Sequence, residues 1–120
     1  MEPTGVHHVS INVDDVGTAV DFYTTVLGLR LRTDRPDLGV GGAWLDAGGQ
    51  QVHLIEAVVP DNRGQHFALR VDDLGAVIGE LRDRGVAVSD PIPVGTNLQA
   101  FLDDPAGNAV ELHQVGGGAS

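Results

Sequence analysis

The sequence contains no cysteine and no lysine among its 120 residues. Without cysteine, disulfides, thiolate nucleophiles and zinc–thiolate sites are excluded. All seven basic residues are arginine, which excludes a Schiff-base lysine and a phosphate-loop lysine. No apolar run approaches the roughly 18–20 residues of a membrane span. The N-terminal residues also lack the basic start and apolar middle of a signal peptide. Together these features predict a soluble, cytoplasmic protein.

Positive charge is scarce as well, because the formal net charge is −10. An acidic surface repels nucleic acid and anionic membranes, so neither is expected as a partner. It would tolerate a cationic ligand, although such charge usually serves only to keep a small protein in solution. The length of 120 residues predicts a single domain, residues 1–120, with one modest core.

An internal repeat is the main feature that is present. A shift of 58 residues superimposes His8 on His66 and the Val-Asp-Asp of residues 13–15 on that of residues 71–73. The same shift superimposes Gly17, Asp46, Gly49, Val52 and Leu54 on Gly75, Asp104, Gly107, Val110 and Leu112. A single register over such a length predicts two copies of one supersecondary unit. The copies cover about residues 5–57 and 64–115, with a linker at 58–63.

Each copy has the pattern of a β-α-β-β-β unit. A strand with period-two alternation ends at an Asp suited to cap a helix, Asp14 or Asp15 in the first copy and Asp72 or Asp73 in the second. Apolar residues then recur at helical spacing until Gly28 and Gly85. Three strands follow in each copy, near 29–33, 42–46 and 50–56, and near 86–89, 98–103 and 108–114. The sequence thus predicts an α+β fold, and the C-terminal "GGGAS" is expected to be a frayed tail.

Four side chains that can bind a metal obey the same repeat. The alternation turns Val9, Ile11 and Val13 toward the helix, so His8 faces the opposite way. The same argument turns His53, His66 and Glu111 away from the helices, and His53 and Glu111 are themselves 58 residues apart. Three imidazoles and a carboxylate suit Zn, Ni, Co, Mn or Fe(II). A cation also gives a physical reason for an inward-facing carboxylate. We therefore predict a metal site formed by His8, His53, His66 and Glu111.

Two longer motifs, "HHVSINVDDVGTAVDFYTTVLGL" and "DDPAGNAVELHQ", resemble the vicinal oxygen chelate superfamily. This superfamily includes glyoxalase I, bleomycin-resistance proteins, fosfomycin-resistance enzymes and extradiol dioxygenases. The resemblance covers nearly the whole chain. It implies two βαβββ modules, each a half-barrel around a metal or ligand cavity, with the family's metal ligands falling on the same four positions. Glyoxalase I usually has Glu where this chain has His53, which is a departure from that branch.

The resemblance implies several activities. The leading one is a metal-dependent lyase or isomerase of glyoxalase type, acting on a small substrate whose adjacent oxygens chelate the metal. Glu111 is then the expected base, with His113 or a metal-activated hydroxide as the alternative. A second possibility is a protein that binds an antibiotic or toxic metabolite, as bleomycin-resistance proteins do. A thiol transferase or dioxygenase remains open, as does a member without enzymatic activity.

Weaker candidates complete the prediction. His113, two residues after Glu111, could shuttle protons, orient a substrate or lie in solvent. Asn12 and Arg70 occupy equivalent places in the two copies and could bind a substrate carboxylate or phosphate, although Arg70 could instead pair with nearby acids. Trp44, the only tryptophan, could belong to the core, a dimer interface or a wall that stacks on a substrate. Unpaired strand edges predict a homodimer, and the sequence leaves open whether one chain or two complete the metal site.

Overall fold

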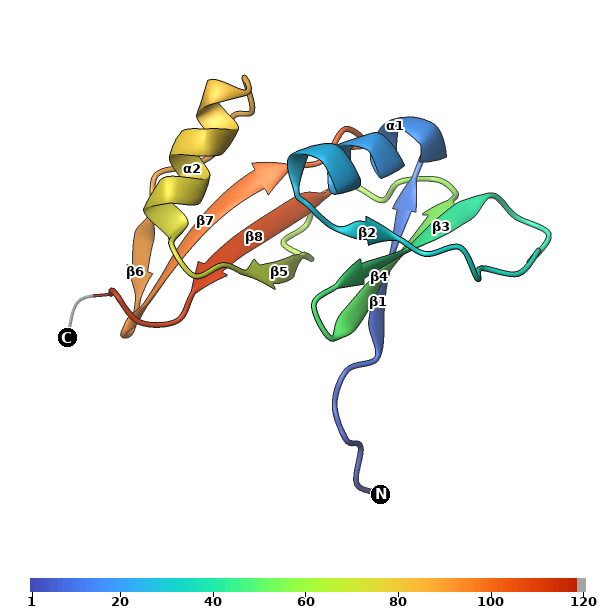
Figure 1. Ribbon diagram of the computed structural model, residues 1–120, viewed down its shortest axis with the longest axis horizontal. Helices are drawn as coiled ribbons and strands as arrows, with labels where there is room; N and C mark the ends of the chain where they lie inside the picture. Colours follow the sequence, from blue (N-terminus) through green and yellow to red (C-terminus); the bar gives the residue numbers. More distant parts are fainter. Residues whose placement is uncertain (119–120) are drawn as a thin grey trace. The chain divides into compact units, whose positions relative to one another are not determined.

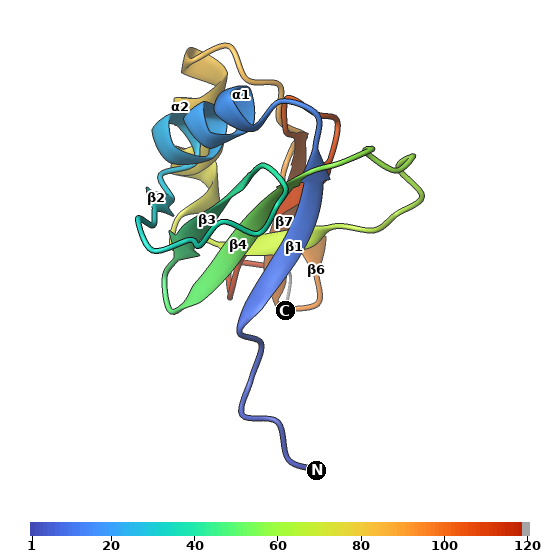
Figure 2. The same ribbon diagram turned by 90° about the vertical axis from the view of Figure 1, so that its right-hand side faces the viewer.

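The computed structural model describes residues 1–118 and divides the chain into two units (Figure 1). The first comprises residues 1–61 and 105–107. Its elements are β1 (His8–Val13), α1 (Val16–Asp21), the π-helix η1 (Phe22–Val26), β2 (Arg30–Leu31), β3 (Gly42–Ala47) and β4 (Gln50–Glu56). The strands form an open sheet in the order β1-β4-β3-β2. The pairing of β1 with β4 is parallel and the other two pairings are antiparallel, as Figure 2 lets the reader follow for β1, β4 and β3.

The second unit repeats this arrangement. Its elements are β5 (Phe67–Arg70), α2 (Leu74–Asp83), β6 (Ile92–Val94), β7 (Asn97–Asp103) and β8 (Ala109–Gln114). The strand order is β5-β8-β7-β6, again with one parallel pairing, between β5 and β8. The predicted α+β fold with two βαβββ modules is therefore confirmed. Both sheets are open along their edges.

Aspartates begin both helices, and the structure decides which member of each Asp-Asp pair does so. Asp15 accepts a hydrogen bond from the backbone N–H of Thr18, and Asp73 accepts one from Ala76, each at 3.0 Å. Both caps have extended backbone, as N-cap residues do. Gly28 and Gly85 follow the helices with φ of +75° and +80°. The left-handed region is reached there without the steric penalty that a side chain would add.

The apolar face of each sheet packs against its own helix. In the first unit α1 contacts β3 and β4, and in the second α2 contacts β7 and β8. The residues predicted to face the helices are buried: Val52 and Leu54 on β4, and Val110 and Leu112 on β8, are at most 2% exposed. Each such side chain stabilises its unit by about 1.5–3 kcal/mol through the removal of apolar surface from water. The opposite face of each sheet is thereby left to the polar residues.

Two strand predictions for the loop-rich parts of the copies need correction. The strand expected near 29–33 is only Arg30–Leu31, and the strand expected near 86–89 is replaced by Ile92–Val94. Hydrogen bonding explains the second error. The Val88 carbonyl accepts from the Arg82 side chain, and the backbone N–H of Phe101 donates to Ser89 Oγ rather than to a backbone oxygen. One backbone bond to β7 is present, from the Ser89 N–H to the Phe101 carbonyl at 3.0 Å, but Phe101 donates back to the Ser89 side chain, so no regular ladder forms.

The expectation of a frayed "GGGAS" tail is wrong for Gly116–Gly118, whereas residues 119–120 lie outside the described residues. The N–H of Gly116 donates to the Asn97 side chain at 2.9 Å, and that of Gly118 donates to the Thr96 carbonyl at 3.0 Å. A Cβ on Gly118 would collide with the backbone of Thr96 and Asn97. The glycines let this segment lie directly on the start of β7. Among residues 1–118, no helix combines the length and the apolar character needed to cross a bilayer.

Removal of the two cap carboxylates tests how each helix begins. We expect Asp15→Ala and Asp73→Ala each to lower the free energy of unfolding by about 1 kcal/mol, because one helix N–H loses its acceptor. Urea unfolding followed by circular dichroism measures this. The matched controls are Asp14→Ala and Asp72→Ala, which replace the other member of each pair and should change stability by less than half as much. An equal loss in cap and control variants would contradict the assignment.

Candidate functional site

The polar face of the first sheet carries a stack of three rings. The register places Trp44, His53 and Ser10 in one row across β3, β4 and β1. The His53 ring lies between those of His8 and Trp44, with centroid distances of 3.9 and 4.6 Å and interplanar angles of 14° and 13°. This sandwich leaves His53 only 8% exposed although its strand face is polar. The predicted metal ligands His8 and His53 thus lie face to face.

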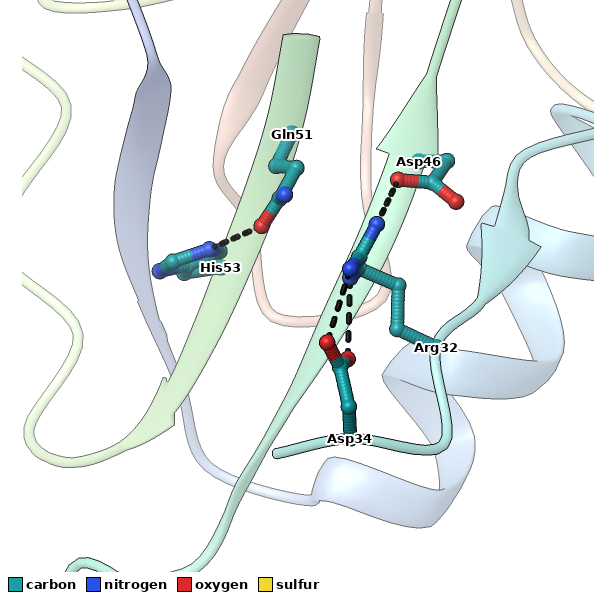
Figure 3. A network of polar contacts seen from close by, with 5 residues as sticks. All are labelled: Arg32, Asp34, Asp46, Gln51 and His53. Atoms are coloured by element: carbon teal, nitrogen blue, oxygen red, sulfur yellow. Dashed lines mark hydrogen bonds and ion pairs between the residues drawn. The ribbon is translucent and has the colours of Figure 1, made fainter. Parts of the chain in front are cut away.

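Local contacts favour a neutral His53. Its Nε2 is 2.8 Å from Gln51 Oε1, an oxygen that can only accept, so Nε2 carries the proton and Nδ1 the lone pair (Figure 3). Burial lowers the pKa of His53, and electrostatic repulsion from His8, His7, Arg32 and Arg35 lowers it further. The neutral imidazole is the form that binds metals.

The ring orientation of this pair does not yet suit a shared ion. The lone pair of an imidazole nitrogen lies in the ring plane, so a bound metal lies close to that plane. Two rings stacked within 14° of parallel cannot both direct a lone pair at one nearby point. Furthermore, His8 Nδ1 is 2.9 Å from His7 Nδ1, so one of these two nitrogens carries the proton between them. His8 and His53 suit a metal by their chemistry but would have to leave the stack to share one.

Beside the stack, Arg32 joins two carboxylates (Figure 3). Its guanidinium donates to Asp34 through two nitrogens, at 3.0 and 2.8 Å, and to Asp46 at 2.9 Å. The hydrogen bond from Arg32 lowers the pKa of Asp34, and both carboxylates raise the pKa of Arg32. The two carboxylates neutralise the charge of the Arg32 guanidinium. Because Asp34 lies in the loop after β2 and Asp46 on β3, Arg32 also holds that loop against β3.

The polar face of the second sheet carries a connected set of side chains around Glu111, which is 8% exposed. Glu111 Oε1 is 3.0 Å from His66 Nε2, and Glu111 Oε2 is 2.7 Å from His113 Nδ1. His66 Nδ1 is 2.8 Å from the Gly64 carbonyl, which can only accept, so that nitrogen is protonated. The contact with Gly64 raises the pKa of His66, and the carboxylate of Glu111 adds to this.

The separation of His66 Nε2 and Glu111 Oε1 is that of an ordinary hydrogen bond and is also compatible with two ligands of one ion. Two ligands at about 2.1 Å from one divalent ion and at right angles lie about 3.0 Å apart, and the observed separation is 3.0 Å. The Nδ1–H of His66 donates to a backbone carbonyl, the usual outer partner of a metal-binding imidazole. A cation that replaced the proton between the two atoms would lie off the line that joins them, so both side chains would have to turn toward it.

The sequence matches the description "Glyoxalase/Bleomycin resistance protein/Dioxygenase superfamily" over residues 5–112. The chain belongs to this superfamily. It is 30% identical over 119 residues to the lactoylglutathione lyase of Escherichia coli O157:H7, covering 88% of each chain. It is 31% identical to the probable chloroplastic lactoylglutathione lyase of Arabidopsis thaliana, of which it spans only 35%.

Two solved structures extend the comparison. A glyoxalase family protein from Bacillus anthracis aligns with a TM-score of 0.87 at 24% identity, over 96% of this chain and 98% of the other. TnmS3, an antibiotic binding protein from Streptomyces sp. CB03234, aligns with a TM-score of 0.82 at 29% identity, over the same shares of the two chains. The superfamily fold is therefore shared by an antibiotic binder and by proteins named for glyoxalase chemistry.

The four predicted ligands form two pairs, one in each unit. Among residues 1–118, no three or more His, Asp or Glu side chains are grouped in a way that could hold a metal ion. The Glu111 cluster contains two histidines, but they contact different carboxylate oxygens, so its members do not converge on one point. The four-ligand site stays a prediction.

The weaker candidates have different surroundings. Asn12 donates to the Val58 carbonyl at 2.9 Å and so connects β1 to the linker. Arg70 is exposed and lies opposite His113 across β5 and β8. The expectation that it pairs with nearby acids is not met, because within residues 1–118 it forms no ion pair. Trp44 forms the outer layer of the ring stack.

Sequence reasoning missed two residues of these clusters. Gln51 lies two residues before His53 on the same strand face, so the alternation alone could have found it. Asn97, whose side chain contacts His113, lies on the neighbouring strand β7. Only the pairing register of β7 and β8 brings these two residues together.

The Arg32–Asp34 contact predicts a pH effect. A lowered pKa means that the ion pair stabilises the folded state at pH values above the ordinary Asp pKa of 3.8. This contribution is lost as the pH falls through the folded-state pKa. We expect Arg32→Gln to raise the pKa of Asp34 toward 3.8, as measured by carboxyl ¹³C NMR titration. Arg30→Gln, two residues earlier on β2, is the matched control and should leave the pKa of Asp34 unchanged. A pKa of Asp34 that stays low in Arg32→Gln would contradict the assignment.

Proposed function

We propose that this protein is a divalent-metal-dependent enzyme of glyoxalase type, a lyase or isomerase. Its substrate is a small molecule with oxygens on adjacent carbons. The observation that carries the proposal is the His66–Glu111 pair, whose nitrogen and oxygen are 3.0 Å apart and whose outer hydrogen bonds leave these two atoms facing each other. Relatives named lactoylglutathione lyase support the reaction class.

The proposed ligands are His66 and Glu111 together with His8 and His53, and the ion is Zn, Ni, Co, Mn or Fe. Three imidazoles and one carboxylate are a suitable donor set for these borderline ions. When bound, such an ion supplies Lewis acidity that stabilises negative charge developing on substrate oxygens. The set is completed within one chain or in a homodimer, and a homodimer is part of the proposal.

Glu111 is the proposed general base. The lactoyl group in the relatives' name carries a hydroxyl and a carbonyl on adjacent carbons, which is the substrate pattern that the proposal needs. Isomerisation of such a unit removes a proton from one carbon and returns a proton to its neighbour. Glu111 Oε1, once free of the ion, can accept that proton and deliver it again. His113 keeps Oε2 occupied through its Nδ1, so the proton transfer falls to Oε1.

The weaker candidates have proposed roles in substrate binding. The side chain of Arg70 is exposed near His113 on the polar face of the second sheet, where it can bind a substrate carboxylate. Glutathione conjugates carry such carboxylates. Trp44 offers a flat surface for an apolar group, because its other face is covered by His53. We also propose that Asn12 contributes to substrate binding on the polar face of the first sheet, although its side chain donates a hydrogen bond to the Val58 carbonyl.

A second candidate function is the binding of an antibiotic or toxic metabolite without turnover. The structural similarity to TnmS3, named as an antibiotic binding protein, favours it. The stacked rings of Trp44, His53 and His8 are a platform of the kind on which a planar ligand stacks. The net charge of −10 suits a cationic ligand. For such ligand binding the His66–Glu111 pair would not be required.

Removal of one ligand tests the metal proposal. We expect metal-free protein, prepared without a nickel column, to take up one Zn²⁺ or Ni²⁺ per proposed site. His66→Ala and Glu111→Ala should weaken uptake by more than 100-fold, because two adjacent donors are reduced to one. Isothermal titration calorimetry and elemental analysis measure this. Asp14→Ala, which removes a carboxylate outside the proposed ligand set, is the control and should bind as the parent does.

The same variants separate the two functions. If the protein is an enzyme, metal uptake and the turnover of lactoylglutathione, followed by its thioester absorbance, are lost together in Glu111→Ala. If the parent takes up no metal and Glu111→Ala leaves the thermal shift caused by a cationic planar ligand unchanged, the binding function is favoured and the enzyme proposal fails.

The ring stack provides a second test, because Trp44 is the only tryptophan. A metal held by His8 and His53 requires both rings to leave their parallel arrangement, so His53 must separate from Trp44. We expect Zn²⁺ titration to change the intensity of Trp44 fluorescence with the midpoint found by calorimetry. His53→Ala should abolish this response, whereas Asp14→Ala should retain it. Complete metal uptake with no change in emission would exclude His53 as a ligand.

A further inference from the structure

We propose that Asn97 is a positioning residue that fixes the tautomer of His113 and thereby assigns the two oxygens of Glu111 to different tasks. Oε2 is reserved for His113, and Oε1 is left for the ion. This inference rests on the proposed metal site and adds to it a residue from outside the ligand set. It begins with the hydrogen bonds at the start of β7.

The orientation of the Asn97 amide is fixed by a backbone donor. The N–H of Gly116 donates to Asn97 Oδ1 at 2.9 Å. A backbone N–H can only donate, so the atom that faces it must be the amide oxygen. The other end of the amide is therefore the NH₂ group, and this group is 3.0 Å from His113 Nε2.

The tautomer of His113 follows from this contact. An amide NH₂ group is a donor, so His113 Nε2 must accept and carries no proton. The single ring proton is then on Nδ1, which is 2.7 Å from Glu111 Oε2 and donates to it. Asn97 and Glu111 select the same tautomer from opposite sides of the ring. With both ring nitrogens occupied in this way, His113 acts on Glu111 and is not itself a ligand.

A second fixed end lies at His66. Its Nδ1–H donates to the Gly64 carbonyl at 2.8 Å. A chain of polar contacts thus runs from the Gly116 N–H through Asn97, His113, Glu111 and His66 to the Gly64 carbonyl. Every proton in it is assigned by a backbone group except the one between His66 Nε2 and Glu111 Oε1. Only there can a cation replace a proton without breaking another contact.

The glycine run at the end of the chain supports the Asn97 side of this arrangement. Gly116 and Gly117 have φ of +82° and +83°, a conformation that side chains disfavour. Gly118 donates to the Thr96 carbonyl at 3.0 Å and has no space for a Cβ beside Thr96 and Asn97. The segment can therefore approach β7 closely enough for the Gly116 N–H to reach the Asn97 amide.

The tautomer of His113 provides the direct test, and it needs no metal. We expect ring ¹⁵N chemical shifts of the metal-free protein, labelled at histidine, to show His113 neutral with its proton on Nδ1. Asn97→Ala should give a mixture of tautomers, because Nε2 loses its donor. Asn97→Asp, which is nearly isosteric and protects the test against misfolding, places an acceptor at Nε2 and should bring a proton there. Unchanged His113 shifts in both variants would overturn the inference.

The consequence for the ion is measured by Zn²⁺ affinity. We expect Asn97→Ala and Asn97→Asp each to weaken Zn²⁺ binding by about 10–100-fold, as the loss of an outer-shell partner does. Gln99→Ala is the matched control, because Gln99 lies on β7 opposite His113 but makes no side-chain hydrogen bond within residues 1–118. Its Zn²⁺ affinity should equal that of the parent.

A substitution away from the cluster tests the support from the glycine run. Gly118→Ala should act like Asn97→Ala on the His113 shifts, because the new Cβ displaces the segment that holds the Asn97 amide. Gly79→Ala, in α2 with open space around the new Cβ, is the control and should leave the His113 ¹⁵N shifts unchanged.

The outcomes separate this inference from the proposed function. If the parent binds no Zn²⁺, the proposed function and its link to Asn97 both fail, whereas the tautomer assignment is still judged by the ¹⁵N shifts. If the parent binds Zn²⁺ and the tautomer changes in the Asn97 variants with no loss of affinity, the proposed function stands and the positioning role of Asn97 is overturned.

Discussion

A carboxylate removed from water must be compensated, and the polar face of the second sheet is organised around that requirement. Glu111 is 8% exposed, and each of its oxygens contacts a histidine. A buried, unpaired charge would cost several kcal/mol, so these contacts are conditions for placing the residue there. They also underlie the proposed chemistry, because one carboxylate oxygen is committed to His113 and the other faces the His66 nitrogen with which it is proposed to bind a metal. The proposed activity follows from the way in which this charge is stabilised.

The first sheet solves a different problem with similar residues. His53 is buried by ring stacking between His8 and Trp44, and its neutral form is favoured by burial and by nearby positive charge. Ring stacking buries the His53 side chain but does not orient its nitrogen lone pair toward a partner. The histidines around Glu111, in contrast, are oriented by hydrogen bonds to its two oxygens. The two modules therefore share a backbone topology but differ in how their polar faces hold their histidines. The superfamily's range, from lyases to an antibiotic binding protein, is consistent with such independent use of one fold.

Most of the fold could be predicted from local patterns. The 58-residue repeat, the period-two strands and the helical stripes depend on neighbours in sequence, and they correctly gave two βαβββ modules in the superfamily fold. The errors lie where hydrogen bonds that involve side chains compete with the local pattern. Arg82 and Ser89 divert the hydrogen bonds that a strand near 86–89 would need, and Thr96 and Asn97 anchor a glycine run whose composition alone suggests disorder.

The sequence by itself determined which side chains share a face, because alternation along a strand has a fixed period. Together with the 58-residue repeat, which relates His8 to His66 and His53 to Glu111, this is why the four residues could be predicted as candidate ligands. Only the tertiary structure decided what those side chains do to one another. The register of β7 and β8 places Asn97 beside His113. The parallel ring planes place His53 in a stack with His8 and Trp44. The direction of each hydrogen bond assigns the ring protons of His66 and His113. Such relations depend on the distances between strands far apart in the chain, which no local pattern of residues encodes.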